Sequence, residues 1–213
     1  MRRSATFAAL ALAATSPFAV ALDSGGAPPV PAGAYTLDKT HTSLIFRVSH
    51  MGFSTYTGRF TKVDAKLDFD PTRVANSRVN VTIDPRSINA DNAPSGFLEM
   101  LSGKDWLDAA KFPEMAFRSK AIEVTGANTF RVRGELTLHG ATKPVVLNAS
   151  YNGGYAGHPM DPNARIGFSA RGKFKRSDFG VSIAIPEAGT NMGVGDEVEV
   201  VLESEFNGPP LAQ

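Results

Sequence analysis

The stretch 129-TFRVRGELTL-138 decides the fold class, because apolar and polar residues alternate along it. Its apolar residues share one parity and its charged residues the other: Phe130, Val132, Leu136 and Leu138 against Arg131, Arg133 and Glu135. Side chains of a β-strand point to opposite faces with a period of two. The stretch therefore predicts a strand with one face on an apolar core and the other in water.

The same alternation recurs along most of the chain. Further strands are expected at Thr42–His50, Thr55–Phe60, Val63–Phe69, Arg78–Ile83, Met115–Val124, Val145–Tyr151, Ile166–Phe174 and Val198–Phe206. Within the fifth of these the apolar phase changes near Ser119, which predicts a β-bulge there. Strands that follow one another through short turns are typical of an all-β antiparallel barrel or sandwich.

Residues 93–110 break the alternation. Apolar residues recur there at spacings of three and four, namely Phe97, Leu98, Leu101, Trp106 and Leu107. This spacing predicts one or two short helices, the second capped by Asp105 and ended by Pro113. A helical insertion in a β chain can cover one end of a barrel. It would do so either as packing alone or as the mouth of a site for an apolar ligand.

The two ends of the chain have their own composition. Met1-Arg2-Arg3 is followed by an apolar run, and Ala19 and Ala21 are the small residues that precede signal peptide cleavage. We therefore expect residues 1–21 to be a cleaved signal peptide and the protein to be exported. Residues 22–34 are rich in Pro, Gly and Ala and predict a flexible leader. The barrel domain is expected at 35–207 and a disordered tail at 208–213.

Composition excludes several functional classes. The chain of 213 residues carries a formal charge of +1, which becomes −1 without Arg2 and Arg3, and it has no basic block. A nucleic-acid partner is therefore not expected. The chain contains no cysteine, so it can form no disulfide and cannot attach haem through a thiol.

Catalytic motifs are not evident in the sequence. His41 and His50 flank one expected strand with opposite parity, so they could share a metal ion only across a sharp bend. We predict neither a catalytic residue nor a metal site. One alternative is a hydrolytic or isomerising enzyme for a small soluble substrate, with Asp38, His41 and His50 as acid–base groups. Another is a filled barrel that serves as an interaction module under stress.

Four motifs in order resemble the YceI-like family, over about Tyr35 to Phe206. They are Leu37-Asp38-x-x-His41-x-x-x-x-Phe46-x-Val48-x-His50-x-Gly52-Phe53-Ser54, Asp105-Trp106-Leu107-Asp108-x-x-Lys111-Phe112-Pro113-x-x-x-Phe117, Gly134-Glu135-Leu136-Thr137-Leu138-His139-Gly140-x-Thr142-Lys143-Pro144-Val145 and Asp178-Phe179-Gly180. The resemblance implies a lipocalin-like antiparallel barrel of roughly eight strands in the bacterial periplasm. It also implies a long apolar channel that holds a polyisoprenoid, such as an isoprenoid quinone or a polyprenyl phosphate. It implies no catalytic activity, and no cofactor other than the bound lipid.

One departure concerns the head group of such a lipid. Relatives often carry a His-Leu pair before the second motif, where this chain has Met100-Leu101. If that histidine helps to hold a head group, this chain prefers a different one.

The apolar face of the expected strands and helices supplies the candidate ligand site. Its residues are Phe46, Val48, Leu67, Phe69, Val79, Val81, Leu98, Leu101, Trp106, Phe117, Val132, Leu136, Leu147, Phe168 and Phe174. Small residues of the same parity, Gly134, Ala149, Ala170 and Gly172, are expected to leave space beside them. The candidates for holding a head group are His41, His50 and Arg47. We also expect transient contact with a membrane surface, and the sequence leaves a homodimer open.

Overall fold

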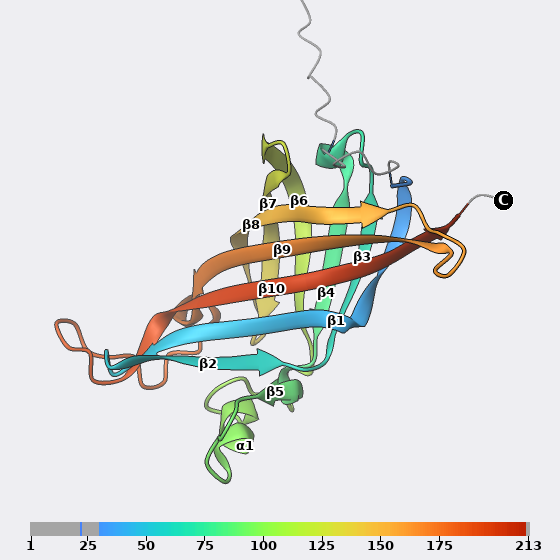
Figure 1. Cartoon of the computed structure of the whole chain (residues 1–213). Helices are drawn as coiled ribbons and strands as arrows, with labels where there is room; N and C mark the ends of the chain where they lie inside the picture. The colour runs from blue at the N-terminus through green and yellow to red at the C-terminus, as the bar shows by residue number, and fades with distance from the viewer. Residues whose placement is uncertain (1–21, 23–29, 212–213) are drawn as a thin grey trace, which may run out of the picture.

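A computed structural model describes residue 22 and residues 30–211 of the chain, and the signal peptide expected at 1–21 lies outside these residues. Ten strands form one antiparallel sheet (Figure 1). They are β1 (Gly33–His50), β2 (Ser54–Phe60), β3 (Val63–Phe69), β4 (Arg78–Ile83), β5 (Ile88–Asn89), β6 (Met115–Gly126), β7 (Thr129–Leu138), β8 (Ala141–Tyr155), β9 (Asn163–Lys175) and β10 (Val194–Pro210). The helical elements are short: α1 (Phe97–Ser102), η1 (Val74–Asn76), η2 (Pro85–Ser87) and η3 (Arg176–Phe179).

Eight of these strands close into a barrel. The ring runs β1–β10–β9–β8–β7–β6–β4–β3 and returns to β1, because β1 pairs with both β10 and β3. The strand β2 pairs with the second half of β1, and β5 pairs with β2, so the sheet continues beyond the ring towards α1 (Figure 1). The all-β antiparallel barrel that the sequence predicts is confirmed.

The alternation of the sequence becomes the inside and outside of this barrel. In β3 the residues Val63, Ala65, Leu67 and Phe69 are buried, whereas the three between them are exposed. The bulge predicted near Ser119 is present as a register shift between Ser119 and Ala121 in the β6–β7 pair. It turns the Ser119 hydroxyl to accept a hydrogen bond from the backbone N–H of Val79 at 2.9 Å.

The strand β1 bends sharply near its middle (Figure 1). Its register against β10 shifts between Asp38 and Ser43, so the residues between them form a bulge on the outer surface. Before the bulge β1 pairs with β3, and after it β1 pairs with β2. A bulge increases local twist and bends the strand that carries it, which allows one long strand to serve both ends of the barrel.

The second helix predicted in the insertion is absent. After α1 the chain forms turns, in which the N–H groups of Leu107 and Ala109 donate back to the carbonyls of Leu101 and Ser102. Asp108 has a positive φ of 43°, a conformation that a right-handed helix does not contain. Asp105 therefore caps no helix.

The ends of the barrel domain reach further than predicted. Gly33 and Ala34 pair with β3, and Val30 is buried in the core, so the expected leader is already ordered from residue 30. At the other end Pro210 pairs with Asn163 across β9, which places residues 208–210 in β10 and not in a disordered tail. Among the residues that the structure describes, no helix combines the length and the apolar character needed to cross a bilayer.

Candidate functional site

Three cavities lie in a row inside the barrel. The wide cavity has a volume of about 500 Å³ and lies at the end covered by α1. The middle cavity measures about 110 Å³ and the far cavity about 100 Å³. The middle cavity shares lining residues with each of the others, whereas the wide and far cavities share none. The barrel is therefore neither one open tunnel nor solid.

The wide cavity is large enough for a small-molecule ligand, since such sites usually measure about 300–1,000 Å³. Residues of β1, β2, β5, β6, β7, β9 and β10 form its wall, and α1 with the turns after it covers it. Most of its lining is apolar: Phe46, Val48, Phe60, Ile88, Pro94, Phe97, Met100, Leu101, Trp106, Leu107, Met115, Leu138, Phe174, Val181, Val194, Val198 and Val200. The insertion thus forms part of a cavity wall and does not merely pack on the barrel.

Three polar side chains also line the wide cavity, namely His50, Tyr56 and Arg176. The Tyr56 hydroxyl is buried and has no hydrogen-bond partner among the described residues, and burial raises its pKa. Arg176 is 5% exposed and donates hydrogen bonds to four backbone carbonyls. Its pKa is lowered by burial, and the indole ring of Trp106 lies 5.4 Å from its Cζ atom.

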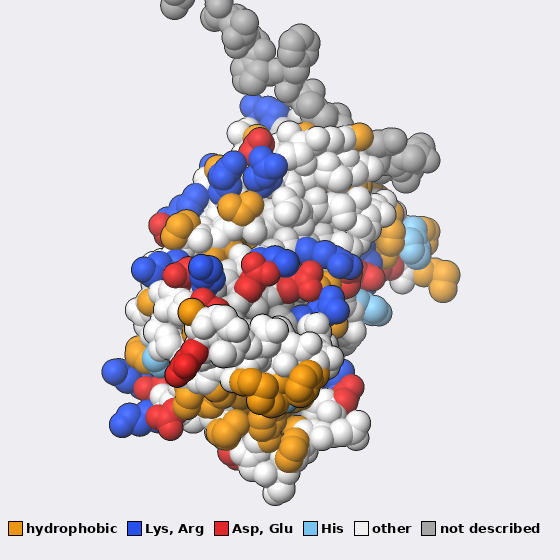
Figure 2. All heavy atoms as spheres, turned by 90° about the vertical axis from the view of Figure 1, so that its left-hand side faces the viewer, with side chains coloured by type: hydrophobic (Ala, Val, Ile, Leu, Met, Phe, Trp, Pro, Cys, Tyr) orange, Lys and Arg blue, Asp and Glu red, His pale blue; other side chains and the backbone are white. Residues whose placement is uncertain are grey.

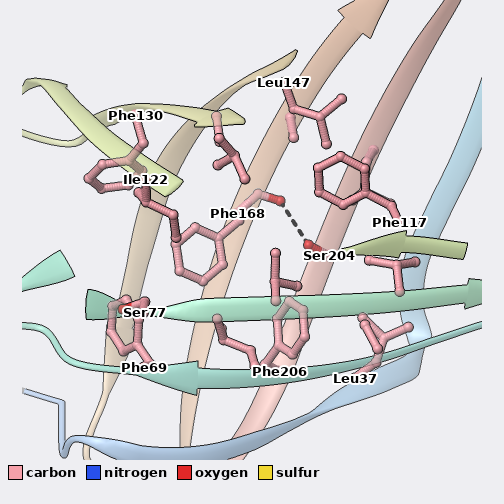
Figure 3. Close-up of a pocket in the computed structure, with 18 of the residues that line it drawn as sticks. Leu37, Phe69, Ser77, Phe117, Ile122, Phe130, Leu147, Phe168, Ser204 and Phe206 are labelled. Atoms are coloured by element: carbon pink, nitrogen blue, oxygen red, sulfur yellow. Dashed lines mark hydrogen bonds between the residues drawn. The ribbon is translucent and has the colours of Figure 1, made fainter. Parts of the chain in front are cut away.

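The far cavity is apolar, and side chains from all sides of the barrel converge on it (Figure 3). Its two polar side chains, Ser77 and Ser204, each have a partner in the protein. The Ser77 hydroxyl accepts from the N–H of Asp70 at 3.0 Å, and the Ser204 hydroxyl donates to the carbonyl of Phe168 at 3.3 Å. The middle cavity is lined by apolar residues throughout. Polar groups without a full set of partners therefore occur at the wide end of the row.

Glycines do not open the interior as the sequence suggested. A Cβ atom on Gly134 would lie 2.3 Å from the Phe117 ring, and one on Gly172 would lie 2.5 Å from Leu147 Cδ2. Phe117 and Leu147 line both the middle and the far cavity. The space left by each glycine is therefore taken by a large side chain that narrows the row.

Most of the predicted ligand residues line these cavities. Phe46, Val48, Leu101, Trp106 and Phe174 line the wide cavity. Leu67, Phe69, Val79, Val81, Phe117, Val132, Leu147 and Phe168 line the far cavity, and Leu136 lines the middle one. Leu98 lines none of the three, because the face of α1 that lines the wide cavity is formed by Phe97, Met100 and Leu101.

The predicted head-group candidates lie apart from one another. His50 lines the wide cavity. Arg47 is the neighbour of Phe46 on β1 and points to the outer surface, where its Nη1 atom lies 3.1 Å from Glu199 Oε2. His41 lies in the β1 bulge, and its side chain is 58% exposed. Arg47 and His41 thus lie on the outer face and do not touch a ligand inside the barrel. Arg47 has the outward parity of its strand, whereas His41 lies in a bulge that the sequence pattern could not place.

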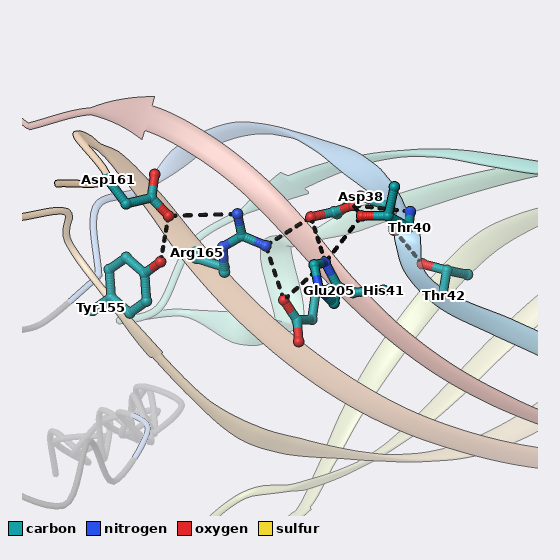
Figure 4. Close-up of polar contacts among 8 residues, drawn as sticks. All are labelled: Asp38, Thr40, His41, Thr42, Tyr155, Asp161, Arg165 and Glu205. Carbon is teal, nitrogen blue, oxygen red and sulfur yellow. Dashed lines mark hydrogen bonds and ion pairs between the residues drawn. The ribbon is translucent and has the colours of Figure 1, made fainter.

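A polar cluster on the outer surface surrounds His41 (Figure 4). Its Nδ1 atom lies 3.0 Å from Asp38 Oδ2, and Arg165 donates to both Asp38 and Glu205 at 2.7 and 3.0 Å. Hydrogen bonds from Thr40 and His41, together with Arg165, hold the pKa of Asp38 well below its usual value. Asp38, His41 and Glu205 could together offer ligands to a metal ion, but the Arg165 guanidinium already supplies a positive charge to both carboxylates.

The acid–base grouping of Asp38, His41 and His50 is not formed. Asp38 and His41 lie in the outer cluster, whereas His50 ends β1 beside the wide cavity. Nine residues of extended strand span about 25–30 Å, which is far beyond the reach of shared proton transfer.

Sequence reasoning missed Tyr56 and Arg176. Tyr56 lies in a predicted strand, and Arg176 lies two residues before the motif Asp178-Phe179-Gly180. Neither pattern predicts that the side chain faces the interior. That orientation comes from the pairing of β2 with β1, and from the turn η3, which carries Arg176 under the end of the barrel.

The outer surface near the wide cavity differs from the rest. One face shows a band of charged side chains with apolar side chains gathered below it (Figure 2). The outer face of β1, β9 and β10 carries the ion pairs Arg47–Glu199 and Lys173–Glu197. On the segments around the wide cavity, Phe53 is 80% and Met192 66% exposed, and Met100 and Ile183 are also exposed. The turn before β2 is tied to the loop before β10 by the hydrogen bond from Met51 N–H to the Gly193 carbonyl at 2.7 Å.

Comparisons with known proteins agree with this architecture. The family model described as YceI-like domain matches residues 35–206. A UPF0312 protein of Vibrio cholerae is 34% identical over 176 residues, which cover 82% of this chain and 87% of the relative. The crystal structure of Burkholderia cenocepacia BcnA is similar with a TM-score of 0.66 at 26% identity, covering 79% of this chain and 98% of that one.

A more distant solved structure has the same fold. It is described as a polyisoprenoid binding domain from Saccharophagus degradans, and it is similar with a TM-score of 0.57 at 16% identity. The match covers 82% of this chain and 98% of that domain. At this identity the likeness concerns the fold alone.

Proposed function

Since the chain belongs to the YceI-like domain family, we propose that the protein binds a polyisoprenoid lipid, an isoprenoid quinone or a polyprenyl phosphate, inside its barrel. The protein acts as a carrier and not as an enzyme. The bound lipid is the ligand of the protein, which uses no other cofactor, and the lipid tail lies along the row of cavities.

The row of three apolar cavities is the observation that carries this proposal. It runs from a wide end with three polar side chains to a far end lined by apolar residues and two internally bonded serines. A ligand that fits such a row is long and apolar, with one polar end. The middle and far cavities are narrow, so a tail enters them as Phe117 and Leu147 change rotamer. The Saccharophagus degradans domain, which is described as polyisoprenoid-binding, supports the same choice of ligand class.

Energetics favour a carrier over a permanent store. Burying one CH₂ group from water contributes about 0.8 kcal/mol, and a tail of tens of carbons would nominally exceed the limit of about −20 kcal/mol for any complex. Such a tail normally resides in a bilayer, where it is already out of water. Transfer from bilayer to barrel therefore changes the free energy little, and the lipid can be both taken up and released.

We place this activity in the periplasm and at membrane surfaces. The support for export is the sequence of residues 1–21, with its positive start and small residues before the expected cleavage site. The support for membrane contact is the set of exposed apolar side chains around the wide cavity, which includes Phe53 and Met192. Whether the protein acts as a homodimer stays a prediction.

A titration followed by tryptophan fluorescence tests the proposed ligand class. Trp106 is the single tryptophan of the chain and lines the wide cavity, so an isoprenoid quinone bound there should quench its emission and saturate. The control is the same quinone ring without its isoprenoid tail, which should bind far more weakly because it buries little apolar area.

Organic extraction of protein purified without detergent completes the test. Mass spectrometry of the extract should detect an isoprenoid lipid in near-stoichiometric amount. Absence of any isoprenoid from the native protein, together with no saturable quenching by added long-tailed lipids, would refute the proposed function.

A further inference from the structure

Two of the three polar side chains that line the wide cavity carry buried polar groups with hydrogen-bonding capacity that the described part of the protein does not use. One is the Tyr56 hydroxyl, which is buried and has no hydrogen-bond partner among the described residues. The other is the Arg176 guanidinium, a permanent cation in the wall of an apolar space. Buried polar groups in proteins are nearly always paired, so an unpaired hydroxyl in a ligand-sized cavity indicates a partner that comes with the ligand.

Arg176 keeps part of its donor capacity free. A guanidinium has five N–H donors. Four of them donate to the carbonyls of Gly195, Val181, Ile183 and Val194 at 2.8–2.9 Å. The remaining donor, on Nη2, has no acceptor among the described residues. No ion pair to Arg176 is found in the described part of the chain either. Its nearest acidic neighbour, Asp196, accepts hydrogen bonds from Ser177 instead.

Strand register places both groups in one layer of the barrel. Tyr56 pairs with Val48, Val48 with Val198, and Val198 with Phe174, and all four residues line the wide cavity. Arg176 follows two residues after Phe174. Adjacent strands lie about 4.8 Å apart, so the row from Tyr56 to Phe174 covers about 14 Å of curved wall. Tyr56 and Arg176 thus lie on opposite sides of one layer of the same cavity wall.

The insertion covers each of the two polar groups with an aromatic ring. Phe97 of α1 packs edge-on against Tyr56 with ring centroids 5.7 Å apart. Trp106 lies over Arg176 at 5.4 Å. These rings exclude water from the polar end of the cavity, and hydrogen bonds in such low-dielectric surroundings are strengthened.

We propose that Tyr56 and Arg176 form the head-group site of the wide cavity, and that it takes a head with hydrogen-bond acceptor oxygens. This proposal rests on the proposed function, because it concerns the polar end of the same lipid. Arg176 can only donate, and the Tyr56 hydroxyl can donate to the same head, so the chemistry that fits is an acceptor oxygen such as that of a carbonyl or a phosphate. Met100 adds an apolar wall to this end.

The variant Tyr56→Phe tests the site by removing one oxygen atom and leaving the ring. Three probes with tails of equal length are used: an isoprenoid quinone, a polyprenyl monophosphate and the hydrocarbon without a head group. We expect the variant to bind a probe with a head about 3- to 10-fold more weakly, as for the loss of one hydrogen bond, and to bind the hydrocarbon as the wild type does. The empty variant should also melt about 1–4 °C higher, because an unpaired buried hydroxyl is removed.

The control is Tyr155→Phe, which removes a hydroxyl bonded to Asp161 on the outer surface. It should leave the affinity for all three probes unchanged. A second variant, Arg176→Lys, keeps the charge but loses the planar array of donors. Arg176→Lys also weakens the hydrogen bonds to the four backbone carbonyls. It is therefore assessed by a ratio, the affinity for a probe with a head group divided by the affinity for the hydrocarbon. This ratio should fall.

The outcomes separate the two proposals. Equal affinity of the wild type for headed and headless probes, or an unchanged ratio in both variants, overturns the head-group site and leaves the lipid-binding function standing. Failure of the wild type to bind any of the three probes overturns both. A Tyr56-dependent preference for the quinone identifies a neutral carbonyl head. A Tyr56-dependent preference for the monophosphate identifies an anionic one, and either preference supports the site.

Discussion

Asp38 shows how one carboxylate on the outer surface depends on its neighbours. It accepts hydrogen bonds from the N–H and hydroxyl of Thr40 at 3.0 and 2.6 Å, and from Arg165 at 2.7 Å. Its side chain is 11% exposed, so these contacts are only partly screened by water. They join the β1 bulge to β9 and make it a fixed part of the barrel wall.

This environment predicts a pH-dependent contribution to stability. The pKa of Asp38 is lowered in the folded protein, so the carboxylate stabilises the fold above its unfolded pKa of about 3.9. The contribution is lost as the pH falls through that value towards the folded pKa. Asp38→Asn should lower the free energy of unfolding by about 1–2 kcal/mol at pH 7, and by less at pH 3.

Urea denaturation at the two pH values measures this difference. Asp68→Asn, which changes an exposed carboxylate on β3, is the matched control and should have little effect at either pH. A loss in Asp38→Asn that is equal at pH 3 and pH 7 would show that the charge of Asp38 does not contribute.

At the scale of elements, the contact between β6 and β7 depends on one glycine. Ser119 pairs with Gly134, and Phe117 pairs with Leu136 in the same ladder. The Phe117 ring lies over Gly134 so closely that a Cβ atom would be 2.3 Å from its Cζ atom and 2.6 Å from the Arg118 carbonyl oxygen. The Arg118 carbonyl oxygen cannot move aside without disturbing the bulge at Ser119.

We therefore expect Gly134→Ala to destabilise the protein by about 1–3 kcal/mol, the usual cost of overpacking a core. Gly167→Ala on β9 is the control, because the nearest atom to its Cβ would lie at 3.8 Å. Both are measured by urea denaturation. Equal free energies of unfolding for the two variants would contradict the close contact between Phe117 and Gly134.

At the scale of the whole molecule, the row of cavities predicts that affinity depends on tail length. Ala170 on β9 lines both the middle and the far cavity. Ala170→Leu fills space there and leaves the wide cavity unchanged. We expect it to weaken binding of a long-tailed isoprenoid quinone about 10-fold, a loss of about 1.4 kcal/mol, while a quinone whose short tail stays in the wide cavity binds as before.

Fluorescence titration of Trp106 with quinones of two tail lengths measures this effect. The control Ala121→Leu makes the same change at an exposed position of β6 and should alter neither affinity. Equal weakening of both quinones by Ala170→Leu would show that the tail does not extend into the middle and far cavities.

Strand identity and core composition follow from the sequence because both depend on local alternation. Residues two positions apart along a strand lie on the same face of the sheet. Phe130, Val132 and Leu138 could therefore be assigned to the interior without a structure. The bulge at Ser119 was predictable for the same reason, as a break in that period. In the segment after α1, the spacing of Trp106 and Leu107 from the apolar residues before them predicted a second helix. The backbone turns there instead, because Asp108 has a positive φ and the N–H groups return to α1.

The sequence could predict which residues of the candidate site point inward, but not the size or position of the cavities that they line. Alternation tells which side chains point inward, but whether they leave a cavity depends on how strands far apart in the chain pack against one another. Phe117 filling the space beside Gly134 is such a case.

An all-β chain with an apolar inner face follows from the order of the residues, because alternation is a property of neighbours along the chain. Only the packing of distant strands shows that this face encloses one wide and two narrow cavities, and that Tyr56 and Arg176 both line the wide one. Closure of β1 on β10 joins residues more than a hundred positions apart, and no local pattern carries that information.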